Sequence, residues 1–217
     1  VRLDAQMLER EARRPEGPRA ERMGELAGRI ARTLDRMDGV FKELLFMSRP
    51  AQAVSERFDL RQCLRSCVET LAARLEHARL RVVFDMPDTP AAVGLAEPPL
   101  RRAIVNVLQN AIQHAPADSV IDIRLAADPE DPRLWCIEIG DRGPGIPPAR
   151  REAVFEMFVT TRPEGTGLGL FMARAAVAHC GGTILALGRD GGGALIRLTV
   201  PKAAEPGSTP GDNPKGT

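Results

Sequence analysis

Three glycines occupy alternate positions in the stretch RPEGTGLGLFMAR, at Gly165, Gly167 and Gly169. The residues from Leu168 to His179 are expected to form a helix. The spacing is not that of a dinucleotide-binding loop, and the lysine of a P-loop is missing. Glycine lets a ligand approach the backbone, and a helix start offers unpaired N–H groups with a partial positive charge. The stretch therefore indicates either a phosphate cradle or a flexible loop before an ordinary helix.

A stripe of polar side chains lies within an otherwise apolar segment, residues 95–115. Asn106 and Asn110 are one helical turn apart, and Gln113 and His114 extend the same face. Asparagine is a mediocre helix former, so its repetition among apolar residues needs a reason. The stripe either faces solvent or binds a ligand. In the second case, amide oxygens can complete the coordination of Mg²⁺ that is already held by phosphates.

The pattern D-x-G-x-G follows an apolar stretch. Asp141 stands just beyond an expected strand, residues 133–139, and Gly143 and Gly145 open the turn after it. A carboxylate at this position can accept a hydrogen bond from an exocyclic amine, and the glycines let a flat ring come close. The same pattern also occurs as a purely structural turn. The segment of about twenty residues before the glycine stretch lacks a regular pattern, which predicts a mobile lid.

Apolar periodicity predicts an α+β domain around these residues. Amphipathic helices are expected at three places: residues 59–75, 95–115 and 168–179. Extended segments are expected at 80–86, 120–126 and 133–139, followed by a hairpin over 182–200 that turns at Asp190 and Gly191. Since each helix has one apolar face, we expect a single antiparallel or mixed sheet covered by three helices on one side.

The N-terminal region has a different sequence pattern, that of long helices. Residues 19–47 predict a long helix with a heptad repeat, in which Met23, Ile30, Met37 and Leu44 recur every seven residues. An earlier helical segment, residues 3–13, is separated from it by the turn RPEGP. One hairpin cannot bury both its faces, and pairing with a second copy into a four-helix bundle would solve this. The alternative is that the long helix packs on its own domain.

Composition narrows the classes of protein modestly. The chain has 217 residues with 30 basic and 29 acidic side chains, and a net charge of +1 argues against nucleic-acid binding. It contains no apolar run that could span a bilayer and no signal peptide, so we expect a cytoplasmic chain without membrane contact. Cys63 and Cys67 lack further ligands at zinc spacing. The four cysteines are therefore predicted to be reduced thiols packed as small apolar side chains.

Four motifs in order resemble the N, G1, F and G2 boxes of bacterial sensor histidine kinases. They are N-x-x-x-N-A at 106–111, D-x-G-x-G at 141–145, F-x-x-F at 155–158 and G-T-G-L-G-L at 165–170. The resemblance covers residues 55–201 as a catalytic, ATP-binding domain of the GHKL (Bergerat) fold, an α/β sandwich. Residues 19–50 are similar to the second helix of the dimerisation hairpin. The domains implied are a hairpin at 1–50, a linker at 51–56, the catalytic domain at 57–202 and a disordered tail at 203–217.

This resemblance implies a role for each motif residue, with ATP and Mg²⁺ as cofactors. Asp141 would read the adenine amine, and Gly143, Gly145 and Ile146 would form the base pocket. Asn106 and Asn110 would hold Mg²⁺ and the phosphate chain, and so carry catalysis. His114 would face the nucleotide rather than accept a phosphate. The stretch containing Thr166 would bind phosphates through the backbone N–H groups of Gly165, Gly167, Leu168 and Gly169, and Arg162 would neutralise the γ-phosphate.

The partners implied are a second copy of the chain, through the hairpin, and a response regulator receiver domain. The family's phosphoacceptor is a histidine followed by an acidic residue, and this sequence has none. His77 and His114 precede alanine, and His179 precedes cysteine. If the first helix is cut at Val1, the acceptor would lie upstream, with a membrane sensor beyond it. We therefore expect the cytoplasmic core of a sensor kinase that binds ATP and does not label itself.

Two other functions remain open. The first is a GHKL ATPase that drives a clamp. Such families place a glutamate base four residues before the metal-binding asparagine, and Asn106 occupies that position here. Without a carboxylate to activate water, hydrolysis should be slow. The second is a non-catalytic module that binds nucleotide or a response regulator, and intact glycine boxes with Asp141 argue against it.

Overall fold

The computed structural model describes residues 57–161, 166–189 and 191–203, together with Gly24, Ala27, Gly28 and Ile30. The chain divides into two units, residues 1–49 and 50–217, which are considered separately. The four described residues of the first unit are helical. Apart from these four residues, the predicted hairpin lies outside the described residues, as do its dimer, the linker and nearly all of the predicted tail. The domain boundaries therefore stay a prediction.

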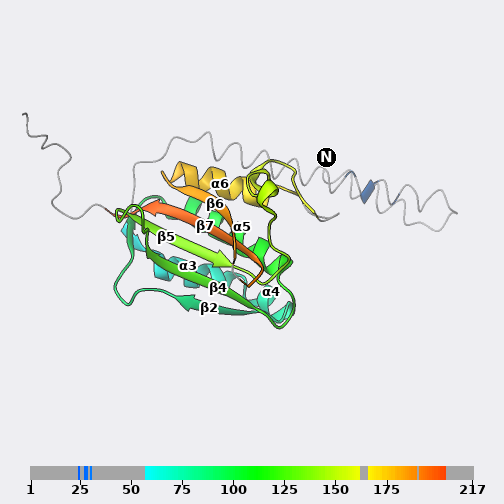
Figure 1. Ribbon diagram of the computed structural model, residues 1–217, viewed down its shortest axis with the longest axis horizontal. Coiled ribbons are helices and arrows are strands. Elements are labelled where there is room, and N and C mark those ends of the chain that lie inside the picture. Colours follow the sequence, from blue (N-terminus) through cyan, green and yellow to red (C-terminus); the bar gives the residue numbers. More distant parts are fainter. Residues whose placement is uncertain are drawn as a thin grey trace, which may run out of the picture. The chain divides into compact units, whose positions relative to one another are not determined.

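A five-stranded mixed sheet forms the centre of the second unit (Figure 1). β2 pairs with β4 in parallel, and every other neighbouring pair is antiparallel. In order across the sheet, the strands are β2 (Arg81–Asp85), β4 (Val120–Ala127), β5 (Leu134–Gly140), β7 (Ala194–Pro201) and β6 (Thr183–Gly188). The predicted mixed sheet is thus confirmed, with β6 and β7 forming the predicted hairpin.

The helices cover one face of this sheet, behind it in Figure 1. They are α3 (Leu60–Thr70), α4 (Ala72–His77), α5 (Glu97–His114) and α6 (Gly169–His179). The core lies between the two layers, because alternate residues of β4 and β5 point toward the helices and are buried, among them Ile121, Ile123, Ile137 and Ile139. The opposite face carries the charged side chains of Arg124, Glu138 and Arg197 in one cross-strand row.

The predicted helix over residues 59–75 is wrong at its start and its middle. Asp59 ends a short strand, β1 (Arg57–Asp59), which pairs with β3 (Ala92–Gly94) in a second, two-stranded sheet. Strands of this length show no periodicity, so the sequence pattern could not reveal them. The helix breaks at Leu71, where the backbone leaves helical geometry while the side chain stays buried.

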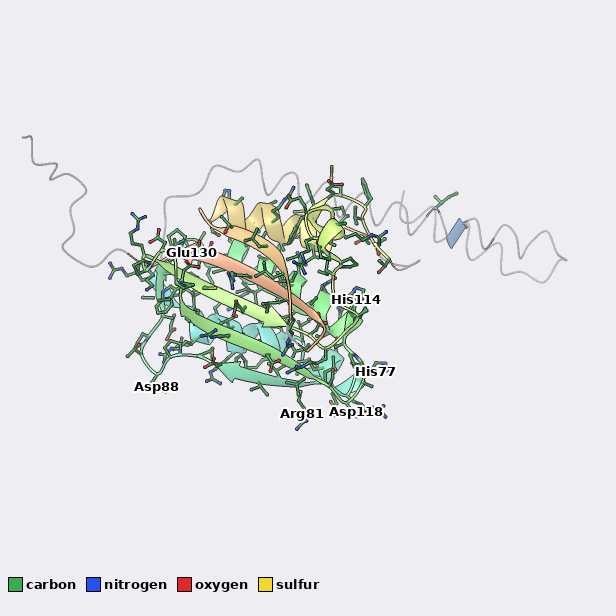
Figure 2. The ribbon with its side chains drawn as sticks, in the orientation of Figure 1. His77, Arg81, Asp88, His114, Asp118 and Glu130 are labelled. Carbon is green, nitrogen blue, oxygen red and sulfur yellow. The ribbon has the colours of Figure 1, made fainter. Side chains whose placement is uncertain are left out.

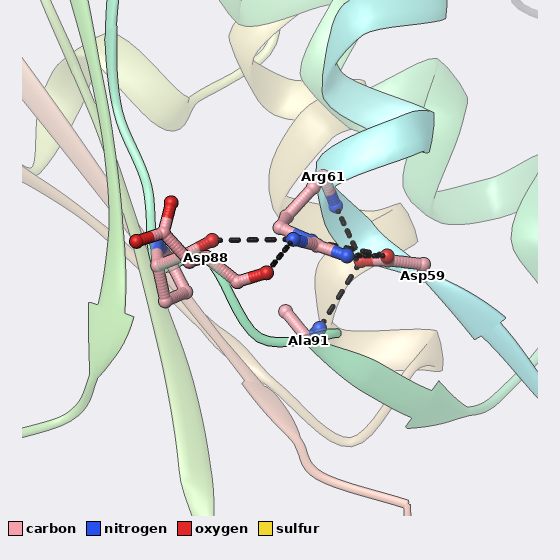
Figure 3. Close-up of polar contacts among 5 residues, drawn as sticks. Asp59, Arg61, Asp88 and Ala91 are labelled. Atoms are coloured by element: carbon pink, nitrogen blue, oxygen red, sulfur yellow. Dashed lines mark hydrogen bonds and ion pairs between the residues drawn. The ribbon is translucent and has the colours of Figure 1, made fainter.

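Asp59 starts α3 as its N-cap (Figure 3). Its Oδ1 accepts hydrogen bonds from the main-chain N–H groups of Arg61 at 3.0 Å and Ala91 at 3.1 Å. The Arg61 guanidinium donates to both carboxylate oxygens and also reaches the main-chain oxygens of Pro87 and Asp88. Hydrogen bonding from Arg61 lowers the pKa of Asp59. One side chain therefore caps α3 and ties it to the segment before β3.

The helix α5 has the features expected of a buried amphipathic helix. Proline stands in its first turn, where its missing N–H costs nothing, and Glu97 pairs with Arg101 one turn later. Its apolar face packs against α3 and α6 and includes Leu100, Ala103, Ile104, Val107, Leu108 and Ala111. This packing fixes which face of α5 remains for the polar stripe.

Candidate adenine nucleotide site

A cavity of about 670 Å³ opens between the carboxyl-terminal half of α5, the loop after β5 and the start of α6. Many of the residues singled out by the sequence motifs line it. They are Asn106, Asn110, His114, Asp141, Gly145, Ile146, Thr166, Gly167 and Gly169. Segments far apart in the sequence thus meet at one cavity. Arg162 and Gly165 lie outside the described residues, so their predicted phosphate contacts stay predictions.

The amide stripe on α5 forms one wall of this cavity. Asn106 and Asn110 are half-buried and face away from the apolar core side of the helix. Gln109 and Gln113 line the cavity beside them, as does His114 at the carboxyl end of α5 (Figure 2). Of the chain's three histidines, all of which are described, only His114 lines the cavity. The stripe therefore faces a concave surface rather than open solvent.

Asp141 lines the cavity and is buried, with only 3% of its surface exposed. It follows Gly140, the last residue of β5, and its main-chain N–H donates to Ala194 O at 3.0 Å. The carboxylate Oδ1 accepts hydrogen bonds from the main-chain N–H groups of Gly143 at 2.7 Å and Ala194 at 3.3 Å. Among the described residues, no group donates to Oδ2. Since buried polar atoms are normally paired, this oxygen is available to a ligand.

The glycines after Asp141 are needed for packing within the protein. A Cβ on Gly143 would lie 2.5 Å from the main-chain oxygen of His114, so the loop can approach the end of α5 only at a glycine. Gly145 has a φ of +77°, and a Cβ there would lie 2.9 Å from Gly193 O. Gly143 itself is not among the residues that line the cavity. Close approach of a flat ring to these glycines therefore stays a prediction.

Two short 3₁₀ helices interrupt the predicted irregular lid, η1 (Pro148–Arg150) and η2 (Ala153–Phe155). Phe155 is buried in the core, whereas Phe158 is 65% exposed. Within the lid, the main-chain N–H of Phe158 donates a hydrogen bond to Gly167 O at 3.0 Å. A Cβ on Gly167 would lie 2.6 Å from the Phe158 Cα, so this close crossing requires glycine. The F and G2 motifs thus meet through their backbones.

The helix α6 begins at Gly169, with Leu168 as its N-cap, so its start points into the cavity. No side chain caps it, and Leu168 itself does not line the cavity. A Cβ on Gly169 would meet nothing within 4 Å. This glycine leaves open space at the helix start, where the first N–H groups lack helical partners.

Several residues of the site were missed by sequence reasoning. Ala194 lines the cavity and hydrogen-bonds Asp141 from the start of β7, and Arg150 lines the cavity from η1. The glycines at 191–193 were a signal for a turn, but their proximity to Asp141 depends on strand order, which no local pattern shows. The spacing of Gln109 from Asn106 could have placed it on the same face.

Comparison with known proteins identifies the family. Residues 96–204, just over half of the 217 residues, match the family model described as histidine kinase-, DNA gyrase B-, and HSP90-like ATPase. The chain belongs to this ATPase family. The matched region of the ATPase domain contains α5, the loop after β5 and α6, which together line the cavity.

The ATPase domain is similar to bacterial sensor kinases. The chain is 28% identical over 193 residues to the sensor protein KdpD of Escherichia coli K12, covering 87% of this chain and 21% of KdpD. It matches the mycobacterial sensor histidine kinase MprB with a TM-score of 0.62 and 30% identity, covering 69% of this chain and 99% of that chain. The predicted resemblance to bacterial sensor histidine kinases and the GHKL-type fold are thereby confirmed. The chain spans about a fifth of the length of KdpD.

A third similarity concerns the fold alone. The full-length structure of ShkA in complex with AMPPNP matches with a TM-score of 0.68 at 22% identity, covering 93% of this chain and 44% of that chain. Within the described part of the ATPase domain, no helix combines the length and apolarity that crossing a membrane requires. The described residues also contain no group of three or more His, Cys, Asp or Glu side chains suited to a metal.

Proposed function

We propose that this ATPase domain binds Mg²⁺-ATP as the catalytic part of a sensor histidine kinase and donates the γ-phosphate to a histidine that lies outside this sequence. The observation that carries the proposal is the carboxylate of Asp141. It is buried at the wall of a large cavity and held by two main-chain N–H groups through Oδ1, while no described residue donates to Oδ2. A carboxylate can only accept hydrogen bonds, so it favours a ligand with an exocyclic amine, such as adenine.

The other residues of the cavity suit the rest of a nucleotide. Ile146, Val154 and Leu170 supply apolar wall, which suits a flat base. Asn106 and Asn110 offer amide oxygens along one side of α5, a donor set compatible with Mg²⁺ that is mainly held by phosphates and water. Mg²⁺ would neutralise charge on the phosphate oxygens when bound. The cavity residues therefore fit Mg²⁺-ATP.

Positioning and charge neutralisation are the main requirements of phosphoryl transfer. The amides of Asn106 and Asn110 would orient the phosphate chain from α5. The main-chain N–H groups around Gly167 and Gly169 would approach it from the start of α6. Arg162 would add positive charge from the lid. None of these groups forms a covalent bond to the phosphate, so each contributes by holding it in line with an incoming imidazole.

The proposed biological context follows from the sensor kinase family. The acceptor histidine would belong to the hairpin of a cytoplasmic homodimer, and the phosphate would pass on to the receiver domain of a response regulator. The AMPPNP complex of ShkA shows that a protein with a similar fold binds an ATP analogue. The sensor kinase names of KdpD and MprB favour kinase activity over clamp-type hydrolysis.

Calorimetric titration of the 217-residue chain with ATP, with ADP as the control, each with and without Mg²⁺, tests the proposal. We expect saturable binding of ATP that Mg²⁺ strengthens. Absence of binding at millimolar nucleotide would contradict the proposal and favour a non-catalytic interaction module. An ATP affinity that is the same with and without Mg²⁺ would contradict the proposal that Asn106 and Asn110 hold the metal.

A further inference from the structure

The segment between β6 and β7 contacts the residue on which the proposed function depends. Arg189 follows β6 directly, and only 14% of its side chain is exposed. Its Nη1 donates a hydrogen bond to the main-chain oxygen of Asp141 at 2.8 Å. Its Nη2 forms an ion pair with Asp122 Oδ2 on β4. The guanidinium thus links two strands to the peptide that follows Asp141.

The residue before Asp141 leaves room for this guanidinium. A Cβ on Gly140 would lie 2.8 Å from Nη1 of Arg189 and 3.2 Å from its Cζ. Glycine at the end of β5 therefore allows the arginine to lie across the strand end. Any other residue would push the guanidinium away from the main-chain oxygen that it now contacts.

The backbone of the same segment packs on Asp141 from a second direction. A Cβ on Gly193, whose φ is +100°, would overlap Asp141 O. The main-chain oxygen of Ala194 accepts a hydrogen bond from the Asp141 N–H, and the Ala194 N–H donates to the Asp141 carboxylate. Asp141 is consequently held through its main-chain N–H, its main-chain oxygen and one carboxylate oxygen, and all three contacts involve residues 189–194.

Asp122 connects this cluster to one more charge. Its Oδ2 also pairs with Arg142 Nη2 at 3.2 Å, and the Arg142 side chain is well exposed. Arg189 is the better buried of the two arginines, and it alone also contacts Asp141 O. A buried guanidinium with fixed partners on both sides is a rigid support, since its planar fork loses little entropy per hydrogen bond.

We propose that Arg189, anchored by Asp122, is a positioning residue that fixes the aim of the Asp141 carboxylate and thereby sets the selectivity of the site for a 6-aminopurine over a 6-oxopurine. This inference rests on the proposed function. An amine at position 6 donates to a carboxylate, whereas an oxo group at that position can only accept. Discrimination therefore depends on holding the carboxylate where it must meet the group at position 6.

The test compares ATP with ITP, which differ at that position, in competition binding to the 217-residue chain. The variants are Arg189→Met, Arg189→Lys and a matched control, Arg197→Met. Arg197 pairs with Glu138 on the face of the sheet away from the helices, and its guanidinium hydrogen-bonds Glu138 rather than Asp141. We expect Arg189→Met to lower the ratio of ATP to ITP affinity about tenfold, with ITP affinity within about twofold of the unchanged chain. Arg189→Lys should lower the ratio less than Arg189→Met does, and Arg197→Met should leave the ratio unchanged.

Asp122→Asn provides the same test without removing the arginine, and it serves if Arg189→Met fails to fold. It should lower the ratio in the same direction. In an Asp141→Asn background, Arg189→Met should have no further effect on the ratio, because its action passes through that carboxylate.

An unchanged ratio in Arg189→Met or Asp122→Asn, with ATP still bound, would overturn the inference and leave the proposed function standing. An equal loss of ATP and ITP affinity would also overturn it, because general disruption of the fold does not distinguish bases. Failure of the unchanged chain to bind either nucleotide would overturn the proposed function and the inference together.

Discussion

At the scale of single residues, the proposed nucleotide selectivity would depend on one buried carboxylate, that of Asp141. Burial of Asp141 costs free energy unless its oxygens are paired, and two main-chain N–H groups pair only Oδ1. No described residue donates to the other oxygen, and on a side chain this well buried a hydrogen bond to a ligand is stronger than in bulk water. Asn106 and Asn110 are half-buried by comparison, so water can take over part of the contact that either amide would make with a ligand.

Replacing Asp141 with asparagine tests this reading directly. Asp141→Asn keeps the shape and removes the charge, so ATP binding should weaken by about 1.5–3 kcal/mol, which is about ten- to a hundredfold in affinity. Calorimetry at constant Mg²⁺ measures the change. Glu138→Gln in β5 is the control, because Glu138 pairs with Arg197 on the face of the sheet away from the helices. An affinity change below about twofold in Asp141→Asn would speak against adenine recognition by this carboxylate.

At the scale of elements, short connections decide how helices are held on the sheet. The cap on α3 is the clearest case, because Asp59 joins β1, the first turn of α3 and the segment before β3. Its partner Arg61 spans from the carboxylate to two main-chain oxygens of the 87–88 segment (Figure 3). The lid is held in a similar way, because one hydrogen bond between the main chains of Phe158 and Gly167 joins the F motif to the G2 motif.

Asp59→Ala should destabilise the domain by about 2–3 kcal/mol at pH 7, since it removes an N-cap and leaves Arg61 without its carboxylate. The pKa of Asp59 is lowered in the folded state by hydrogen bonding from Arg61. A lowered folded pKa means that the stabilisation is fully present above the unfolded value of about 3.9 and is lost as pH falls through the folded pKa. Urea unfolding of both chains should therefore show a difference that is constant near pH 7 and shrinks below about pH 4.

The matched control is Asp85→Ala. Asp85 also pairs with an arginine, Arg124, but both side chains are well exposed. Its replacement should change the urea midpoint far less than Asp59→Ala, because exposed ion pairs contribute little. If the loss of stability in Asp59→Ala were the same at pH 3 and pH 7, the charge of Asp59 would have no part in it.

At the scale of the whole molecule, the fold buries all four thiols of the chain, although Cys136 lies outside the main core cluster. All four cysteines are free and buried, as the sequence predicted. Burial raises the pKa of Cys136 to about 11 and that of Cys180 to about 11. Side-chain hydrogen bonding with Cys67, together with burial, also raises the pKa of Cys63. The thiols therefore act as small apolar side chains of the core.

Their reactivity should report global unfolding. At pH 8 a thiol of pKa 11 is about one part in a thousand thiolate, against about a quarter for an unperturbed cysteine. We expect native Cys136 and Cys180 to react with a disulfide reagent orders of magnitude more slowly than the urea-unfolded chain, in which four thiols should titrate. Fast labelling of either in the native protein would show that the core around it opens easily.

Phosphate transfer is the second prediction at this scale. None of the three histidines is followed by an acidic residue, and His114 is the one that lines the cavity. Incubation of the chain with γ-labelled ATP should therefore leave it unlabelled, whereas a chain extended upstream by the first hairpin helix should be labelled at a histidine. Incorporation into the 217-residue chain itself would contradict the proposed acceptor position.

The amino-acid sequence alone determined the class of fold, the main helices and strands, and the residues of the proposed site in α5 and around the glycine motifs. These depend on local rules: apolar periodicity, the spacing of residues on one helix face, and turn chemistry. The pairing of Asn106 with Asn110 was readable because three to four residues make one helical turn. Ordered motifs added the family, since four together are far more specific than one.

Only the tertiary structure decided what surrounds those residues. The short strands β1 and β3, the break at Leu71 and the contact of Arg189 with Asp141 depend on strand order and on pairings distant in sequence. The glycines illustrate the difference, because the sequence indicated room for a ligand at Gly143 and the structure shows contact with the His114 backbone. A local pattern specifies which conformations a residue can adopt, while its neighbours in space are set by how the whole sheet is assembled.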